Sequence, residues 1–184
     1  PEKPIPIMIG TWGPKMCALA GEVADEVKVG GSANPDVVPV IRGYIGAGED
    51  RAGRPRGTVG VVMGAVTVVD SDREQARSAA RRAVARYLPV VAPLDPTLNV
   101  DPELMKRLRR HVEHSEYEEA SGLISDAMID RFAFSGTAGD IIEAAEALFE
   151  AGASRVEFGA PHGLSSDEGI RVLGEQVVPV LRRA

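Results

Sequence analysis

Residues 5–15 read Ile5-Pro6-Ile7-Met8-Ile9-Gly10-Thr11-Trp12-Gly13-Pro14-Lys15, and this stretch decides the fold. An apolar run ends at Gly10, a short loop follows, and Pro14 stands where a helix would begin. Proline suits the first turn of a helix because its missing N–H would have no partner there. Apolar residues then recur on one helical face. The pattern predicts a strand at Ile5–Ile9 and a helix from Pro14 to about Ala24.

A junction of strand, glycine loop and helix can bind an anion, because unpaired N–H groups lie at the positive end of the helix dipole. Lys15 supports this interpretation, since a cation in the first turn opposes the dipole unless an anion lies beside it. The alternative is an ordinary turn with a solvated lysine. We therefore predict a phosphate-binding loop formed by Gly10, Thr11, Trp12, Gly13, Pro14 and Lys15.

The rest of the chain repeats the order of strand and helix. Strands are predicted at residues 26–29, 58–69 and 155–158, each followed by a helical pattern. Four strands that alternate with helices predict an α/β fold with a parallel sheet, and four βα units are half of a (β/α)8 TIM barrel. We expect residues 1–184 to form a single domain, with a helical insertion before the last strand at about residues 93–136 that contains no strand.

Local patterns predict where the helices begin and end. Asn34 is the expected N-cap of the second helix, and Ser71 with Glu74 has the spacing of a capping box. Residues 46–57 are rich in glycine and arginine, which predicts a loop before the third strand. Thr137 is the expected cap of the helix after the insertion.

Composition excludes several classes of protein. A net charge of −6 disfavours a nucleic-acid-binding surface. No apolar run approaches the roughly 20 residues that a membrane helix needs, and no stretch has the pattern of a signal peptide. The single cysteine, Cys17, lies on the apolar face of the first predicted helix and is expected to be a buried thiol rather than a nucleophile. We expect a cytoplasmic protein without a membrane or nucleic-acid partner.

A metal site is not expected. His111 and His114 lie three residues apart near the end of a predicted helix, but the sequence offers no third ligand for them. A favourable contact with the helix dipole is the simpler explanation for both.

Several segments together resemble the bacterial luciferase-like superfamily. They are Ile9-Gly10-Thr11-Trp12-Gly13-Pro14-Lys15-Met16 with Leu19-Ala20-Gly21-Glu22-Val23-Ala24-Asp25, then Ala47-Gly48 to Gly53-Arg54, Ser135-Gly136-Thr137, and Val156-Glu157-Phe158-Gly159-Ala160-Pro161-His162-Gly163. Within the superfamily they are most similar to the branch that uses coenzyme F420, typified by methylenetetrahydromethanopterin reductase. The resemblance covers nearly the whole chain but only the C-terminal half of that family's barrel.

The resemblance implies an F420-dependent oxidoreductase. It implies hydride transfer between the deazaflavin and a small substrate such as a methylene-tetrahydropterin. The cofactor phosphate would lie over the loop Gly10–Lys15 and over Gly30, Gly31 and Ser32. The segments named above do not identify a catalytic residue.

Two alternatives stay open at this point. One is an FMN-dependent monooxygenase of the same superfamily, because FMN also presents a phosphate to such a loop. The other is a non-catalytic half-barrel module. Because an isolated half-barrel exposes strand edges and apolar surface, we expect a homo-oligomer or association with the missing N-terminal half.

Individual side chains near the expected site have two interpretations each. Trp12 could cover the cofactor or pack on the start of the helix, and His162 could line a pocket or be solvated. Arg51, Arg54 and Arg56 could meet an acidic cofactor tail or belong to a solvated loop, which is the favoured interpretation.

Overall fold

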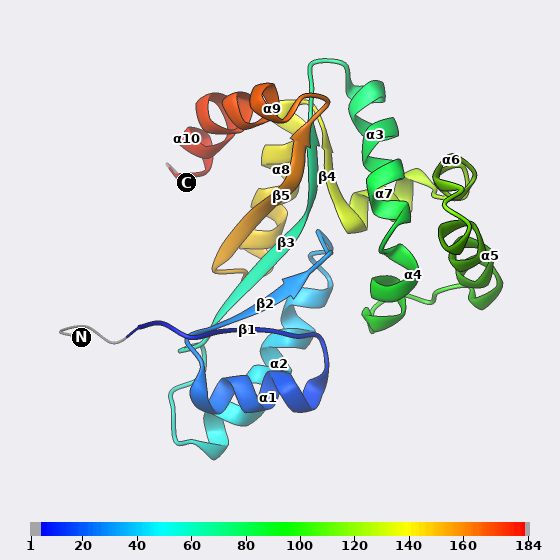
Figure 1. Ribbon diagram of the computed structural model, residues 1–184. Helices are drawn as coiled ribbons and strands as arrows, with labels where there is room; N and C mark the ends of the chain where they lie inside the picture. The colour runs from blue at the N-terminus through cyan, green and yellow to red at the C-terminus, as the bar shows by residue number, and fades with distance from the viewer. Residues whose placement is uncertain (1–4, 183–184) are drawn as a thin grey trace.

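The computed structural model describes residues 5–182, which form a five-stranded parallel sheet with helices packed against it (Figure 1). The sheet order is β1-β2-β3-β4, and β5 pairs with the other edge of β3. The strands are β1 (Met8–Gly10), β2 (Glu26–Gly30), β3 (Gly60–Val69), β4 (Ala133–Gly136) and β5 (Arg155–Gly163). All pairings are parallel, which confirms the predicted α/β class and the half-barrel.

The helices follow the strands in chain order. Those that follow β1, β2 and β3 are α1 (Pro14–Val23), α2 (Val37–Arg51) and α3 (Arg73–Ala85). The segment before β4 contains α4 (Leu88–Val91), the 3-10 helix η1 (Ala92–Leu94), α5 (Pro102–Glu113), α6 (Tyr117–Ser121) and α7 (Asp126–Phe132). After β4 come α8 (Ala138–Glu150), α9 (Ser166–Val172), the π-helical turn η2 (Leu173–Val177) and α10 (Val178–Leu181).

β3 is the central strand of the sheet. Gly60–Gly64 pair with β2, whereas Val66–Val69 pair with β4. The opposite edge of β3 pairs with β5 from Val62 to Val69, with an irregularity between Val66 and Val68. This register decides which side chains of β2 and β5 lie close together across β3.

Two apolar clusters hold the sheet and helices together. In the first, Val27 and Val29 of β2 are fully buried with Val61 and Met63 of β3 and with apolar residues of α1, α2 and α8. The second surrounds Val68 and joins α3 to the helices of the segment before β4. Because strand side chains alternate between faces, Glu26 and Lys28 point away from the first cluster.

The expectation that residues 93–136 contain no strand is wrong. β4 occupies Ala133–Gly136, and all four of its residues are buried. Its hydrogen bonds come from the far end of β3, a partner that the local sequence does not reveal. The segment is therefore helical up to Phe132 and ends in a strand.

Three further predictions of local structure are corrected. Residues 46–51 belong to α2 rather than to a loop, and Gly48 packs so closely on α1 that an added Cβ would lie 1.7 Å from the carbonyl oxygen of Ala18. Asp72, not Ser71, is the N-cap of α3 and accepts a hydrogen bond from the N–H of Gln75. The N-cap of α2 is Asp36 rather than the predicted Asn34. Thr137 caps α8 as predicted, in a capping box with Asp140.

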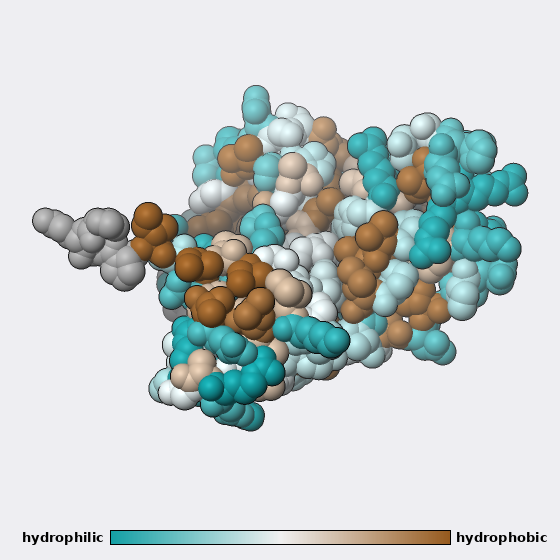
Figure 2. Space-filling model, turned by 60° about the horizontal axis from the view of Figure 1, so that its bottom comes forward, coloured by the Kyte–Doolittle hydropathy of each residue, from teal (hydrophilic) through white to brown (hydrophobic). Residues whose placement is uncertain are grey.

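Exposed apolar side chains gather over β1 and α1, next to the N-terminus of the chain (Figure 2). They include Ile5 (76% exposed), Ile7, Met8, Met16, Leu19 and Val23. Within the described residues, β1 pairs only with β2, so its other edge is free. Among residues 5–182, no helix is both long and apolar enough to cross a membrane.

Candidate functional site

Two hydrogen bonds join the loop that follows β1 to the last residues of β2. The indole Nε1 of Trp12 donates to the carbonyl oxygen of Gly30 at 3.0 Å, and the N–H of Thr11 donates to that of Lys28 at 3.0 Å. Trp12 is partly buried against the first apolar cluster. The structure therefore brings the loop after β1 next to Gly30, the first residue of the second predicted segment, and Trp12 makes the contact.

Among residues 5–182, the first backbone N–H groups of α1 have no hydrogen-bond acceptor. Gly13 is the N-cap, and the helix has neither a side-chain cap nor an acidic residue in its first turn. The first N–H bonded within the helix is that of Cys17, which donates to Gly13 at 2.9 Å, so the N–H groups of Lys15 and Met16 have no helical acceptor. A Cβ added at Gly10 or Gly13 would meet nothing within 4 Å. This open, uncapped end with an exposed lysine fits a phosphate group.

The second predicted segment is less available. The N–H groups of Gly31 and Ser32 both donate to the carbonyl oxygen of Gly64, at 2.6 and 3.1 Å. Ser32 is fully buried, and its hydroxyl accepts a hydrogen bond from the N–H of Asn34 at 3.1 Å. Only Gly30 of this segment faces open space. The residues after β2 can shape the wall of a site, but the donors of Gly31 and Ser32 are already used.

A buried polar network holds this loop against the segment before β4. Nδ2 of the fully buried Asn34 donates to the Asp95 carboxylate at 2.8 Å and to the Thr97 hydroxyl at 2.9 Å. Its Oδ1 accepts a hydrogen bond from Arg131 at 2.8 Å. Because buried polar groups are costly unless they are paired, this network fixes the position of the β2–α2 loop.

A pocket of about 340 Å³, which we call the mouth pocket, lies beside the carboxyl end of β2 and the middle of β3 and β5. Four glycines, Gly30, Gly31, Gly64 and Gly159, contribute to its wall. Tyr87 and Val91, from the connection after α3, line it as well. The Tyr87 hydroxyl donates to the carbonyl oxygen of Phe132, and burial raises its pKa. Tyr87 is therefore a neutral wall residue rather than an acid or base.

An ion pair that the sequence did not reveal lies in this pocket. Lys28 Nζ is 2.6 Å from Glu157 Oε1, and among the described residues these are the only charged side chains that line the pocket. A second pair, Arg155 with Glu26 at 2.5 Å, repeats the arrangement nearer the start of the strands. The sequence does contain one pointer to them. Charged residues alternate with apolar ones in β2 and β5, although strands covered on both faces are usually apolar throughout.

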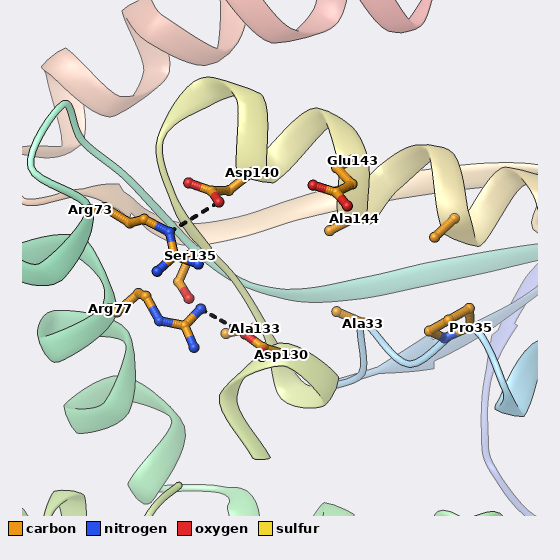
Figure 3. Close-up of a pocket in the computed structure, with 11 residues that line it drawn as sticks. Ala33, Pro35, Arg73, Arg77, Asp130, Ala133, Ser135, Asp140, Glu143 and Ala144 are labelled. Carbon is orange, nitrogen blue, oxygen red and sulfur yellow. Dashed lines mark hydrogen bonds and ion pairs between the residues drawn. The ribbon is translucent and has the colours of Figure 1, made fainter. Parts of the chain in front are cut away.

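A different pocket of about 340 Å³ lies between α3, β4 and α8, and both of its arginines are paired with carboxylates (Figure 3). Arg73 Nε is 3.1 Å from Asp140, and Arg77 donates to Asp130 at 2.6 Å. Partial burial acts to raise the pKa of Asp140, but hydrogen bonds from Thr137 and the nearby Arg73 outweigh it and hold the pKa below 3.8. The buried Ser135 hydroxyl has no partner among residues 5–182. With its arginines already paired, this pocket is a weaker candidate for an anion.

The arginines after α2 make structural contacts. Arg54 donates to the carbonyl oxygens of Gly21 and Ala24 at 3.0 and 2.8 Å, at the end of α1. Arg51 pairs with Glu22, and Arg56 pairs with Asp50. They connect α1, α2 and the following loop.

Cysteine and histidine occupy positions apart from the mouth pocket. Cys17 is buried, and burial raises the pKa of its thiol from 9.0 to about 11. His111 lies 2.7 Å from Glu116, and within residues 5–182 no cluster of three or more histidine, cysteine and carboxylate side chains could hold a metal ion. His162, the second-last residue of β5, has a φ of 78°. It does not line the mouth pocket described above.

Known proteins share this fold and much of this sequence. The chain is 34% identical to 5,10-methylenetetrahydromethanopterin reductase of Archaeoglobus fulgidus over 97% of its length and 55% of the relative's, and 30% identical to the Methanolobus tindarius enzyme over 95% and 54%. The solved coenzyme F420-dependent tetrahydromethanopterin reductase of Methanopyrus kandleri superposes with a TM-score of 0.84 at 27% identity, over 96% of this chain and 51% of that one. The chain thus spans about half the length of the curated relatives it matches. The family model described as luciferase-like monooxygenase matches residues 1–155, and the chain belongs to this family.

Proposed function

We propose that this chain is the C-terminal half of an F420-dependent oxidoreductase that transfers a hydride between coenzyme F420 and a methylene-tetrahydropterin-like or other small organic substrate. The observation that carries the proposal is the uncapped end of α1, with open space at Gly10 and Gly13 and Lys15 beside it. Family membership supports the choice of cofactor, because the relatives reported above include reductases whose names specify F420 or methylenetetrahydromethanopterin.

Each part of the site has a distinct task under this proposal. The N–H groups of Lys15 and Met16 would hold the cofactor phosphate, helped by the Lys15 ammonium. The mouth pocket would orient the ring, and Tyr87 with Val91 would shield it from water. When bound, coenzyme F420 supplies the hydride chemistry. Positioning of the two reactants accounts for much of such catalysis, so the proposal needs no nucleophile from this chain.

Binding of F420 to the chain tests this proposal directly. We expect F420 to bind, and the same deazaflavin without its phosphate to bind at least about tenfold more weakly. Lys15→Met should weaken F420 binding, whereas Lys106→Met, on the exposed face of α5, should not. If FMN binds and F420 does not, the alternative of an FMN-dependent monooxygenase replaces the proposal. If neither binds, the non-catalytic module is the better description.

The apolar surface on β1 and α1 points to a protein partner. We propose that it is covered by a complementary half-barrel, whose strand would pair with the free edge of β1. A second copy of this chain is the alternative occupant. The cytoplasmic location expected from the sequence stays a prediction.

A further inference from the structure

The mouth pocket combines flat walls with one pair of opposite charges. Its sheet side is formed by glycine backbone, and β3 carries Gly64 between Lys28 and Glu157. A Cβ added at Gly64 would lie 3.4 Å from the Cβ of Glu157 and 3.5 Å from the Cε of Lys28. The two side chains therefore meet directly above a backbone that offers no side chain of its own.

The opposite side of the pocket is also narrow. Gly31 has a φ of +80°, and a Cβ added there would lie 3.1 Å from Val91 and 3.3 Å from the Tyr87 ring. The hydrogen bond from Tyr87 to Phe132 holds the aromatic ring in place. Gly31 therefore packs directly against Tyr87 and Val91, and this contact forms one wall of the pocket.

The ion pair has hydrogen-bonding capacity left for a ligand. Lys28 has three donors and uses one on Glu157 Oε1. Among the described residues, neither the other Lys28 donors nor Glu157 Oε2 has a partner. Both side chains are partly exposed, at 33% and 47%, so a ligand in the pocket can reach them. A donor and an acceptor thus lie side by side.

We propose that Lys28 and Glu157 bind the lactam edge of a planar heterocycle in the mouth pocket. The ammonium donates to the ring carbonyl, and the carboxylate accepts from the adjacent ring N–H. The pyrimidine rings of flavins and deazaflavins have this edge, and so do pterins. The inference rests on the proposed function, because it assigns the ring-binding part of the same site. It makes the two residues determinants of ligand choice rather than catalytic groups.

Phosphate-free ring probes test this inference without involving the α1 site. The chain, labelled with ¹⁵N, is titrated with lumichrome, with lumichrome methylated at both lactam nitrogens, and with pterin, while amide signals are followed by NMR. We expect lumichrome or pterin to shift the amides of Gly30, Gly64 and Gly159. Methylation should weaken lumichrome binding about tenfold, since the Glu157 acceptor loses its donor. The stronger of the two rings identifies whether the cofactor type or the substrate type of heterocycle is preferred.

Variants separate ligand recognition from structure. Lys28→Met and Glu157→Gln should each weaken ring binding about tenfold, whereas Lys106→Met should leave it unchanged. Circular dichroism should show that all of these variants keep the fold. If Lys28→Met and Glu157→Gln bind the ring as tightly as the unaltered chain, the inference is wrong.

The inference about Lys28 and Glu157 is also wrong if the methylated and unmethylated rings bind equally well, or if no ring binds at all. Inorganic phosphate reports separately on the proposed function. It should shift the amides of Lys15 and Met16 and lose this effect in Lys15→Met. Phosphate binding without ring recognition would leave the proposed cofactor site standing and reject the assignment of Lys28 and Glu157.

Discussion

Lys28 of β2 and Glu157 of β5 are 129 residues apart in sequence, and their charged atoms lie 2.6 Å apart above Gly64 of β3. Parallel pairing of both strands with β3 creates this contact, because Lys28 is in register with Val62 and Glu157 with Gly64. Only a small residue at position 64 lets the two side chains meet. The register of the sheet therefore determines which charged side chains line the pocket.

The Lys28–Glu157 pair should add little to stability. Because both side chains are partly exposed, Lys28→Met and Glu157→Gln should each change the free energy of unfolding by less than about 1 kcal/mol. Urea unfolding of the two single variants and the double variant gives the coupling energy. A coupling above about 2 kcal/mol would mean that the pair is a structural element.

The contact between α1 and α2 should tolerate no side chain at Gly48. In Gly48→Ala, the new Cβ would lie 1.7 Å from the Ala18 carbonyl oxygen, so the helices must separate. We expect a loss of about 3 kcal/mol or more in the free energy of unfolding. Gly43→Ala in the same helix is the control. Its Cβ meets nothing within 4 Å, and alanine should stabilise the helix by up to about 1 kcal/mol. Equal effects of both substitutions in thermal unfolding would contradict the close approach.

The buried network around Asn34 should control the order of the β2–α2 loop. Asn34→Ala removes two donors from the Asp95–Thr97 segment and an acceptor from Arg131, and should cost about 2 to 4 kcal/mol. Hydrogen exchange should accelerate at Gly31–Ala33. Asn99→Ala, at an exposed position in the same segment, should leave both quantities unchanged. Unchanged exchange in Asn34→Ala would show that the network does not hold the loop.

Cys17 should react only when the protein unfolds. Burial raises the pKa of its thiol from 9.0 to about 11, so almost no thiolate is present in the folded state at pH 8. The folded pKa is above the unfolded value, so this group contributes stability that is fully present below pH 9.0 and is lost as the pH rises toward about 11. Labelling with a disulfide reagent at pH 8 should therefore follow the unfolding rate. Immediate stoichiometric labelling of the native protein would rule out the buried position.

The apolar surface on β1 and α1 should drive association. We expect the isolated chain to self-associate in light scattering, since free strand edges and apolar patches pair readily. Leu19→Lys, within the patch, should lower the apparent mass. Val90→Lys replaces a more exposed apolar residue on α4, outside the patch, and should not. A monodisperse monomer of the unaltered chain would contradict the expected self-association.

Much of the fold could be predicted because it rests on local patterns. The apolar periodicity that follows Pro14 predicted α1 to within one residue, and Thr137 predicted the start of α8. The prediction of a loop was right for residues 52–57 but wrong for residues 46–51, which belong to α2. Glycine weakens a helix locally, but Gly48 is needed where α1 and α2 touch, and packing outweighs the local preference.

The candidate site was predictable only in part. The β1–α1 junction has a local sequence pattern, and the structure shows its helix end uncapped. The donors of Gly31 and Ser32 could not be judged in the same way, because their acceptor is the carbonyl of Gly64 on a strand paired from elsewhere in the chain.

The sequence by itself determined the alternation of strands and helices, because hydrophobic periodicity, caps and helix-starting prolines act over a few residues. Only the tertiary structure decided that β4 is a strand, that Trp12 ties the β1–α1 loop to the end of β2, and that Lys28 meets Glu157. These features depend on strand register and close packing between distant segments. Their free energy comes from partners that no local window of sequence contains.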